Sequence, residues 1–260
     1  MKITWYGTAS ILLEAEGERI LFDPFVQLPG GEHIFPPDTF IQEKHILITH
    51  GHVDHLLSVP AIQKRSKAAV YCTNQAAVTL KRFSGRRGQV VRIAPGDRIN
   101  IGGIQITVLP GKHIRFDRRL VLEVLFRPRT YLRLQNSLYL AKMNHRFPEN
   151  GETVMYQIEA EGKMILLMGS LALCDGVDYP RGADLLVLPF QGSSRLVEAA
   201  LPVIETLSPK NVLLDHFDDA FPPISSSIDT GEFVKRMARE WPDIKVMIPA
   251  AGIPIEMTDV

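Results

Sequence analysis

The fold is decided by the stretch Thr49-His50-Gly51-His52-Val53-Asp54-His55, which places three histidines and one aspartate within six residues. The segment before it, His45-Ile46-Leu47-Ile48, is short and apolar and predicts a buried strand. The cluster therefore lies where a strand ends and a loop begins, so its four side chains can point into one small volume. Imidazole nitrogens and carboxylate oxygens suit zinc and related divalent metals. We predict a metal site here; the alternative is a solvated polar loop.

Two stretches near the start of the chain accompany the cluster: Ile3-Thr4-Trp5-Tyr6-Gly7-Thr8-Ala9-Ser10 and Ile20-Leu21-Phe22-Asp23-Pro24-Phe25. Together with the cluster they resemble the metallo-β-lactamase superfamily, and within it the ascorbate-6-phosphate-lactonase-like branch. The resemblance covers nearly the whole chain apart from a stretch after residue 114. It implies an α/β fold of four layers, an αββα sandwich with a metal site at one sheet edge. It also implies hydrolysis of esters, lactones, lactams, phosphodiesters or thioesters, so it indicates the chemistry better than the substrate.

The same resemblance implies which side chains hold the metal. Each is an imidazole or a carboxylate in the histidine cluster or at the end of a later predicted strand. Zinc is the expected metal, as one or two ions, with manganese and iron as alternatives. The implied ligands are His50, His52 and His113 for one metal position, and Asp54, His55 and His216 for the other.

Ser170 is the last of the implied metal residues, because most relatives carry at its position an aspartate that bridges two metals. A neutral hydroxyl is a poor ligand beside a carboxylate, and it removes a negative charge that would compensate two cations about 3.5–4 Å apart. We therefore expect one strong site, or a second site of low occupancy. Asp175, five residues further on, is the alternative source of a carboxylate.

Two carboxylates have expected roles beside the metal. Asp54 would orient the attacking water or act as general base, with His216 as the second catalytic residue. Asp23 follows an apolar strand and is expected to fix a ligand imidazole from behind. The alternative interpretation of Asp23 is a turn-forming Asp-Pro pair.

The composition is that of an ordinary globular protein, with 45% hydrophobic residues. No stretch of the 260 residues is rich enough in Gly, Ser or Pro to divide them, so we predict a single domain over 1–260. The 29 basic and 29 acidic residues cancel, which argues against a nucleic-acid partner. Two cysteines without a Cys-x-x-Cys pattern, and no apolar signal core, predict a cytoplasmic protein with reduced thiols. The oligomeric state stays open, a homo-oligomer included.

Apolar patterns predict a β-meander over residues 2–22, with a hairpin connection at Glu16-Gly17-Glu18. Helical patterns then alternate with strands, which favours helices packed on the faces of a sheet. The chain should be pseudo-symmetric, with one strand-rich half before residue 110 and another after residue 150. The loop Pro24–Glu43 is rich in Pro and Gly and is a candidate for part of the substrate rim.

Residues 115–150 depart from the family pattern and predict a helical insertion, broken or kinked at Pro128. Between residues 115 and 146, eight basic residues stand against two acidic ones, a net charge of +6. Because the insertion follows His113 directly, it is placed to cover the site; the alternative is a solvated basic face. The candidate substrate-binding residues are Arg115, Arg118 and Arg119.

Three functions fit this sequence. The first is a metal-dependent hydrolase that uses a metal-activated water on a small anionic ester, lactone or phosphodiester, because the basic insertion adjoins the site. The second is a phosphodiesterase acting on a lipid or a nucleotide, since an apolar and basic helical pair suits a membrane surface. The third is a metal-binding module whose catalysis is impaired by Ser170. Retention of the five ligand histidines and Asp54 argues against the third.

Overall fold

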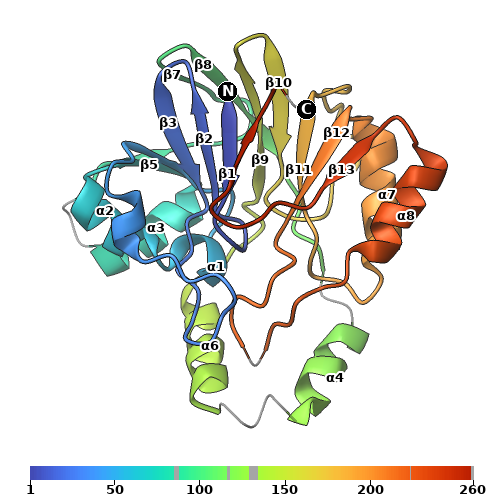
Figure 1. Cartoon of the computed structure of the whole chain (residues 1–260). Helices are drawn as coiled ribbons and strands as arrows, with labels where there is room; N and C mark the ends of the chain where they lie inside the picture. Colours follow the sequence, from blue (N-terminus) through green and yellow to red (C-terminus); the bar gives the residue numbers. More distant parts are fainter. Residues whose placement is uncertain (85–87, 116–117, 129–133, 223, 259–260) are drawn as a thin grey trace.

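The computed structural model describes residues 1–84, 88–115, 118–128, 134–222 and 224–258. Two seven-stranded sheets lie face to face, and helices cover their outer faces (Figure 1). The strands are largely apolar on both faces, so each sheet buries one face against the other sheet and one against helices. The predicted four-layer α/β sandwich is confirmed.

The first sheet begins with the predicted meander. β1 (Lys2–Trp5), β2 (Ile11–Ala15) and β3 (Glu18–Phe22) are antiparallel neighbours. Glu16 and Gly17 turn the chain between β2 and β3 with positive φ angles of 52° and 76°. Three strands then continue the sheet in parallel with β3, and the last strand of the chain pairs with β1. These four are β4 (His45–Leu47), β5 (Ala69–Cys72), β6 (Val90–Arg92) and β14 (Pro254–Glu256).

The second sheet has the strand order β13-β12-β11-β10-β9-β8-β7. Its first four strands in sequence are antiparallel, and β10 to β13 are parallel neighbours. The strands are β7 (Arg98–Ile101), β8 (Ile104–Pro110), β9 (Val154–Ala160), β10 (Lys163–Leu167), β11 (Leu185–Pro189), β12 (Asn211–Asp215) and β13 (Lys245–Met247).

The two halves of the chain do not coincide with the two sheets. β7 and β8 precede residue 110 but lie in the second sheet, because β8 pairs with β9 across the insertion. β14 comes from the end of the chain but lies in the first sheet, where Ile255 pairs with Ile3. β7 was not predicted from the sequence, since of its four residues only Ile101 is buried.

A continuous apolar layer fills the space between the sheets. Trp5, Phe22 and Tyr156 are among its largest side chains and are fully buried. Burying a side chain such as that of Phe22 contributes roughly 1.5–3 kcal/mol to folding. The hydroxyl of Tyr156 also donates to the carbonyl of Ile48 at 2.7 Å. This bond joins the second sheet to the chain immediately before the histidine loop.

Helices form the outer layers and pack on the faces of the sheets, as the alternation of helical and strand patterns indicates (Figure 1). α2 (Val59–Ser66) and α3 (Asn74–Ser84) lie beside the first sheet, where their apolar residues pack with those of β4 and β5. α7 (Leu196–Leu207) and α8 (Gly231–Glu240) cover the second sheet in the same way, with Phe233 fully buried. A short 3₁₀ helix, η1 (Pro37–Phe40), packs against α2.

The described part of the predicted insertion contains the helices α4 (Arg118–Phe126) and α6 (Leu134–Arg146). Both lie beyond one end of the sandwich, at the lower end of Figure 1. α4 ends two residues before Pro128, in agreement with the break expected from the proline. Within the described ranges, no helix combines the length and the apolar character needed to cross a bilayer.

Hydrogen bonds tie the insertion to the loop that follows β12. The guanidinium of Arg127 donates to the hydroxyl of Ser226 at 3.0 Å. The amide of Asn136 donates to the carbonyl of Pro222, also at 3.0 Å. The insertion and this loop therefore belong to one wall of the molecule, although about 90 residues of chain separate them.

Candidate active site

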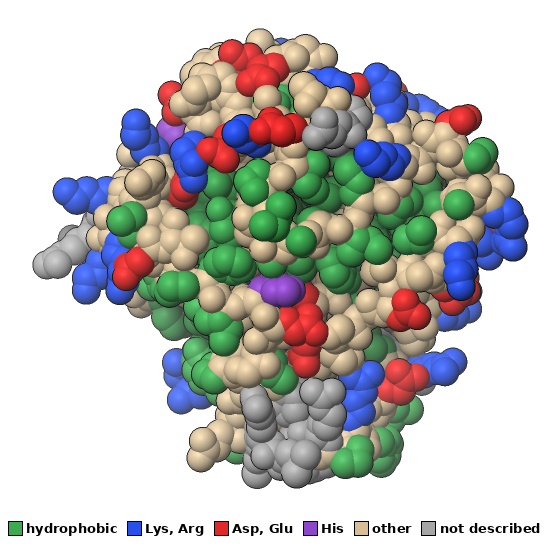
Figure 2. Space-filling model, in the orientation of Figure 1, with side chains coloured by type: hydrophobic (Ala, Val, Ile, Leu, Met, Phe, Trp, Pro, Cys, Tyr) green, Lys and Arg blue, Asp and Glu red, His purple; other side chains and the backbone are tan. Residues whose placement is uncertain are grey.

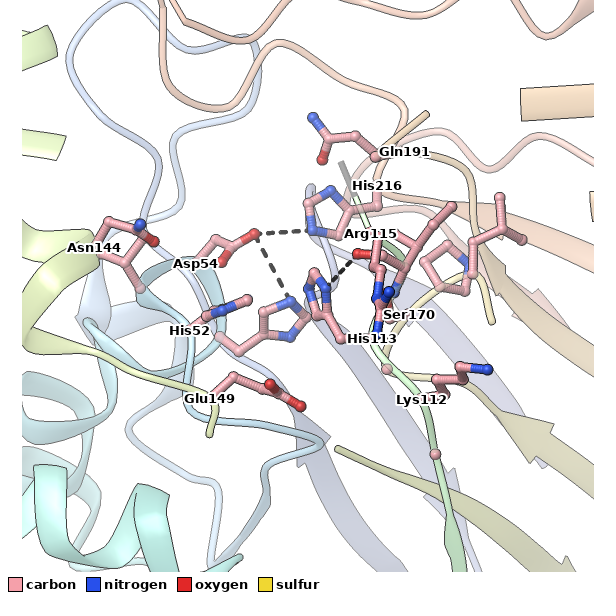
Figure 3. A pocket seen from close by; sticks show the side chains of 18 of the residues that line it. His52, Asp54, Lys112, His113, Arg115, Asn144, Glu149, Ser170, Gln191 and His216 are labelled. Atoms are coloured by element: carbon pink, nitrogen blue, oxygen red, sulfur yellow. Dashed lines mark hydrogen bonds and ion pairs between the residues drawn. The ribbon is translucent and has the colours of Figure 1, made fainter. Parts of the chain in front are cut away.

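The histidine loop leaves β4 and turns at once into a short helix, α1 (Val53–Leu56), with His52 as its N-cap residue. Val53 and Leu56 are buried in the apolar cluster between the first sheet and its helices. Because this side of α1 is held in the core, the other side presents Asp54 and His55 to the edge of the sandwich, where the remaining candidate residues lie (Figure 3).

Three imidazoles form the first cluster: His50, His52 and His113. Nε2 of His50 lies 3.1 Å from Nδ1 of His52, and the ring centroids of His52 and His113 are 4.5 Å apart. Nδ1 of His113 donates to the carbonyl of Ile114 at 2.7 Å, so the lone pair of this neutral ring is on Nε2. Burial lowers the pKa of all three rings, that of His52 to about 4. They are neutral at pH 7 and able to act as ligands.

The second cluster consists of Asp54, His55 and His216. Oδ2 of Asp54 lies 3.1 Å from Nε2 of His216 and 3.7 Å from Nε2 of His55. Burial opposes ionisation of Asp54, but His55 and His216 outweigh it and hold the pKa of the carboxyl well below its ordinary value. Burial also opposes the charge of His55, but the carboxylates of Asp23 and Asp54 raise its pKa to about 9. In the metal-free protein this cluster is therefore an ion pair.

The two clusters adjoin and fit divalent metal ions. In each, three ligand atoms lie within 4.8 Å of one another. The ring centroids of His50, in the first cluster, and His55, in the second, are 3.9 Å apart, so the two clusters are in direct contact. Imidazole with carboxylate is a donor set that zinc accepts readily. The structure thus brings the six predicted ligands together in the two predicted groups.

Asp23 lies behind the clusters, at the end of β3, and is 1% exposed. Its Oδ1 accepts from the backbone N–H of Thr49 at 2.8 Å, and its Oδ2 accepts from the hydroxyl of Thr49 at 2.6 Å. Oδ2 also lies 3.0 Å from Nδ1 of His55, so the expected contact between Asp23 and a candidate ligand imidazole is present. This contact points the other ring nitrogen of His55 toward Asp54.

Ser170 follows β10 and lines the same cavity as the clusters. Its hydroxyl oxygen accepts from the backbone N–H of Ile114 at 3.0 Å, so it holds the turn that carries His113. Asp175 does not supply the carboxylate that Ser170 lacks. Its side chain is 95% exposed, pairs with Lys112 at 2.8 Å and belongs to neither cluster.

A cavity of about 1020 Å³ opens over both clusters (Figure 3). Its apolar wall comes from α6, through Leu140 and Ala141, and from the loop after β12, through Phe221 and Ile224. Residues of α6 in the insertion therefore line this cavity. None of the described residues lining this cavity comes from the loop 24–43, so the part of that loop in a substrate rim stays a prediction. The polar lining residues outside the clusters include Lys112, Arg115, Asn144, Glu149 and Gln191.

The three arginines predicted to bind substrate have different surroundings. Arg115 lines the cavity. Arg119 is not among its lining residues, because its side chain is 77% exposed and pairs with Glu123 of the same helix at 2.9 Å. The side chain of Arg118 lies outside the described part of the chain. Lys112, which the sequence did not single out, lines the cavity near Arg115.

Glu149 is a cavity residue that sequence reasoning missed. It lies near His52 and His113 in Figure 3. The chain comes close there because Gly51 has no side chain; a Cβ at Gly51 would lie 2.8 Å from the carbonyl oxygen of Pro148. In the sequence, Glu149 stands in a Pro-Glu-Asn-Gly run that is typical of a turn, so nothing distinguished it from a solvated residue.

Asp215 was also missed. It is 1% exposed, and no hydrogen-bond partner for its Oδ1 is found among the described residues. Burial raises the pKa of its carboxyl well above the ordinary value. The available signal was its place at the end of an apolar strand, directly before the predicted ligand His216.

Comparisons with known proteins agree with this geometry. The family model of the beta-lactamase superfamily domain matches residues 18–217. A UPF0173 metal-dependent hydrolase of Carboxydothermus hydrogenoformans is 30% identical over 253 residues, which are 96% of this chain and 97% of the relative. Igni18, a metallo hydrolase from Ignicoccus hospitalis, has a similar structure, with a TM-score of 0.68, 21% identity and 98% of both chains covered. An isothiocyanate hydrolase from Delia radicum gut bacteria follows, with a TM-score of 0.64, 16% identity and 98% of both chains covered.

The fold and the metal-binding donor set define the class, that of the metallo-β-lactamase-fold hydrolases. The chain belongs to the beta-lactamase superfamily and, within it, to the family of UPF0173 metal-dependent hydrolases. It is a metal-dependent hydrolase, as predicted. The particular lactonase-like branch suggested by the sequence stays a prediction.

The raised pKa of His55 predicts a pH dependence of stability in the metal-free protein. The folded pKa is about 9 against an ordinary 6.5, so protonated His55 stabilises the fold fully below pH 6.5 and loses this effect as the pH rises through 9. With chelator present, the difference in unfolding free energy between the native protein and His55→Gln should fall by on the order of 3 kcal/mol over that range. Urea denaturation at each pH measures it.

The matched control is His145→Gln, which replaces a histidine exposed on α6. Its difference from the native protein is measured at the same pH values. A difference for His55→Gln that stays constant or grows from pH 6.5 to 9 would contradict the ion pair between His55 and the two carboxylates.

Proposed function

We propose that the protein hydrolyses a small anionic ester, lactone or phosphodiester, with zinc held by the two clusters and manganese or iron as alternatives. One observation supports this most directly: both clusters open into the cavity that also exposes Lys112 and Arg115. An anionic group of the substrate would pair with Arg115, and with Lys112 in place of its exposed partner Asp175, while its scissile bond lies over the clusters. The catalytic and ligand roles of the individual residues are part of the proposal.

The residues of the site have separate roles in this proposal. Asp54, kept ionised by His55 and His216, would orient the attacking water or accept its proton. His216, whose Nε2 lies 3.1 Å from Oδ2 of Asp54, would help to hold that carboxylate over the site. Asp23 fixes the ring of His55 and Ser170 fixes the turn of His113. When bound, zinc would act as a Lewis acid and lower the pKa of water toward about 7.

The number of ions is expected to be nearer one than two. The first cluster consists of neutral imidazoles, whereas the second must lose the proton of His55 before it can bind a cation. Ser170 supplies no bridging charge, and its hydroxyl already accepts a hydrogen bond from Ile114. Both features weaken the second cluster relative to the first.

Titration with Zn²⁺ tests this assignment. Metal-free native protein should bind close to one equivalent tightly, and His52→Ala should lose most of that binding. Ser170→Asp should raise the stoichiometry toward two, because a carboxylate can bridge two ions and compensates their charge. Asp175→Ala is the matched control and should leave the titration unchanged, since Asp175 is exposed and lies outside the clusters. Two equally tight sites in the native protein, or unchanged binding by His52→Ala, would contradict the assignment.

Steady-state kinetics test the anionic substrate. Activity on phosphorylated lactones, phosphodiesters and neutral esters is compared with and without chelator. For an anionic substrate, Arg115→Ala should raise KM about tenfold or more, the cost of one charge-assisted hydrogen bond, and it should affect a neutral analogue much less. Arg119→Ala is the control with little expected effect, because Arg119 pairs with Glu123 outside the cavity. Equal effects of Arg115→Ala on both substrates would argue against an anionic substrate.

A second candidate function, phosphodiester hydrolysis on a lipid, is favoured by the surface of the insertion. On α4 and α6, Leu122, Phe126 and Leu138 are 51%, 78% and 62% exposed. Basic side chains lie among hydrophobic ones at the lower end of Figure 2. Residues 115–146 carry a net charge of +6 in a chain of zero charge, so the rest of the chain carries −6. An apolar and basic end beside the cavity suits an anionic membrane surface.

Co-sedimentation with vesicles tests this second candidate. The native protein should bind phosphatidylglycerol vesicles more strongly than phosphatidylcholine vesicles, and added salt should weaken the binding. The double substitution Leu122→Ser with Phe126→Ser should reduce it, whereas Phe83→Ser on α3, 40% exposed, should not. Absence of binding, or concentration-dependent self-association that the same substitutions abolish, would assign these side chains to another partner. The cytoplasmic location and the oligomeric state stay predictions.

A further inference from the structure

His216 is held in a backbone conformation that its neighbours must enforce. It follows β12 with a φ angle of 62°, a left-handed value that a histidine rarely adopts alone. Its backbone N–H donates to the carbonyl of Thr8 at 2.8 Å. The ring of His216 contacts Asp54, and the backbone of His216 sets the direction of the ring. Because Thr8 holds that backbone, the direction of the ring depends on the position of the turn at Thr8.

The turn at Thr8 is in turn held by Asp218. Thr8 lies between β1 and β2 with a φ angle of 51°, and its N–H donates to both carboxylate oxygens of Asp218 at 3.0 and 3.1 Å. Thr8 therefore binds the chain on both sides of Phe217, through its carbonyl and through its N–H. The ring of Trp5 stacks on Phe217 at 4.8 Å and its indole donates to the Thr8 carbonyl, which closes this unit.

Gln27 completes the network. Its amide nitrogen donates to Oδ2 of Asp218, and its amide oxygen accepts from the backbone N–H of His33 at 2.8 Å. Each donor faces an acceptor, so the orientation of the Gln27 amide is determined. The network is buried, since the exposed fractions of Thr8, Gln27 and Asp218 are 0%, 3% and 2%. If a substitution removes one hydrogen-bond partner from this network, water does not take its place. Gly7 has no room for a side chain here, because a Cβ would lie 2.6 Å from Nε2 of Gln27.

We infer that Asp218, supported by Gln27, is a positioning residue for the second cluster. Its carboxylate holds the Thr8 turn, the turn holds the backbone of His216, and His216 is thereby aimed at Asp54. Asp218 does not touch the clusters' ligand atoms, so it acts through His216 alone. The inference rests on the proposed role of Asp54, His55 and His216 as metal ligands.

Asp218→Asn tests the inference with little change in shape. The new amide would place an NH₂ group opposite either the N–H of Thr8 or the amide nitrogen of Gln27, so one donor would face another. We expect the Zn²⁺ affinity of the second cluster to fall about tenfold or more, as when other partners of metal ligands are removed. The affinity of the first cluster should change less than about twofold. Competition between a chromophoric chelator and the full-length protein measures both.

A paired substitution provides the rescue. In the double variant Asp218→Asn with Gln27→Glu, the asparagine NH₂ faces a carboxylate, and its oxygen still accepts from Thr8. The other glutamate oxygen accepts from His33, so every group is paired again. Second-cluster affinity should return to within about threefold of the native value, which a general loss of stability would not produce. If Asp218→Asn does not fold, Gln27→Met, which removes one donor and leaves Asp218 intact, should weaken the second cluster about threefold.

Glu32→Gln is the matched control. Glu32 joins the same two loops by accepting from the N–H of Asp219 and the hydroxyl of Ser227, but it contacts neither Thr8 nor His216. It should leave the Zn²⁺ affinities unchanged even if it lowers the melting temperature. Equal weakening of both clusters by Asp218→Asn, no weakening at all, or no recovery in the double variant would overturn the inference. If the native protein binds no Zn²⁺, the proposed function fails first and the inference with it.

Discussion

The rest of the site depends on the contacts that the buried carboxylate of Asp23 makes with Thr49 and His55. β3 and β4 are parallel neighbours, so Asp23 at the end of one strand reaches Thr49 beyond the end of the other. The same carboxylate contacts His55. Burying a carboxylate without partners has a high cost in free energy. Asp23 is therefore tolerated only when the histidine loop takes the path that brings Thr49 and His55 to it. The second sheet also packs against Thr49, at Gly169. This close approach requires a glycine, because a Cβ at position 169 would lie 2.4 Å from the Cβ of Thr49.

This arrangement gives the two clusters opposite electrostatic characters. The first is a group of neutral rings, since burial lowers the pKa of His50, His52 and His113. The second keeps its charges because carboxylates face imidazoles across it. A metal ion would therefore have to displace a proton to bind the second cluster but not to bind the first. The difference arises because Asp23 and Asp54 together outweigh burial at His55, whereas burial outweighs the effect of Asp54 at His52.

The insertion forms part of the cavity wall, but no described residue of it belongs to either cluster. α6 and the loop after β12 form its apolar wall, and Arg127 and Asn136 hold the two together. Part of the basic charge counted in the sequence is used in these contacts or in pairs such as that of Arg119 with Glu123. The net charge of the segment is therefore a poor measure of the charge at the cavity. Arg115 and Lys112 both line it, but Lys112 pairs with Asp175 at 2.8 Å.

The sequence by itself predicted most of the strands, because these depend on local apolar patterns, and its resemblance to a known superfamily implied the four layers and the six residues of the two clusters. Apolar patterns mark most of the strands, and the histidines of the two clusters follow β4, β8 and β12, whose ends meet at one edge of the sandwich. It did not determine which sheet β8 and β14 join, since their partners are distant in the chain. Nor did it indicate Glu149, Asp215 or Asp218, which look like turn or loop residues until the fold buries them or turns them toward the site. Tertiary structure alone decided these, because burial and hydrogen-bond partners are properties of packing and not of neighbours in sequence.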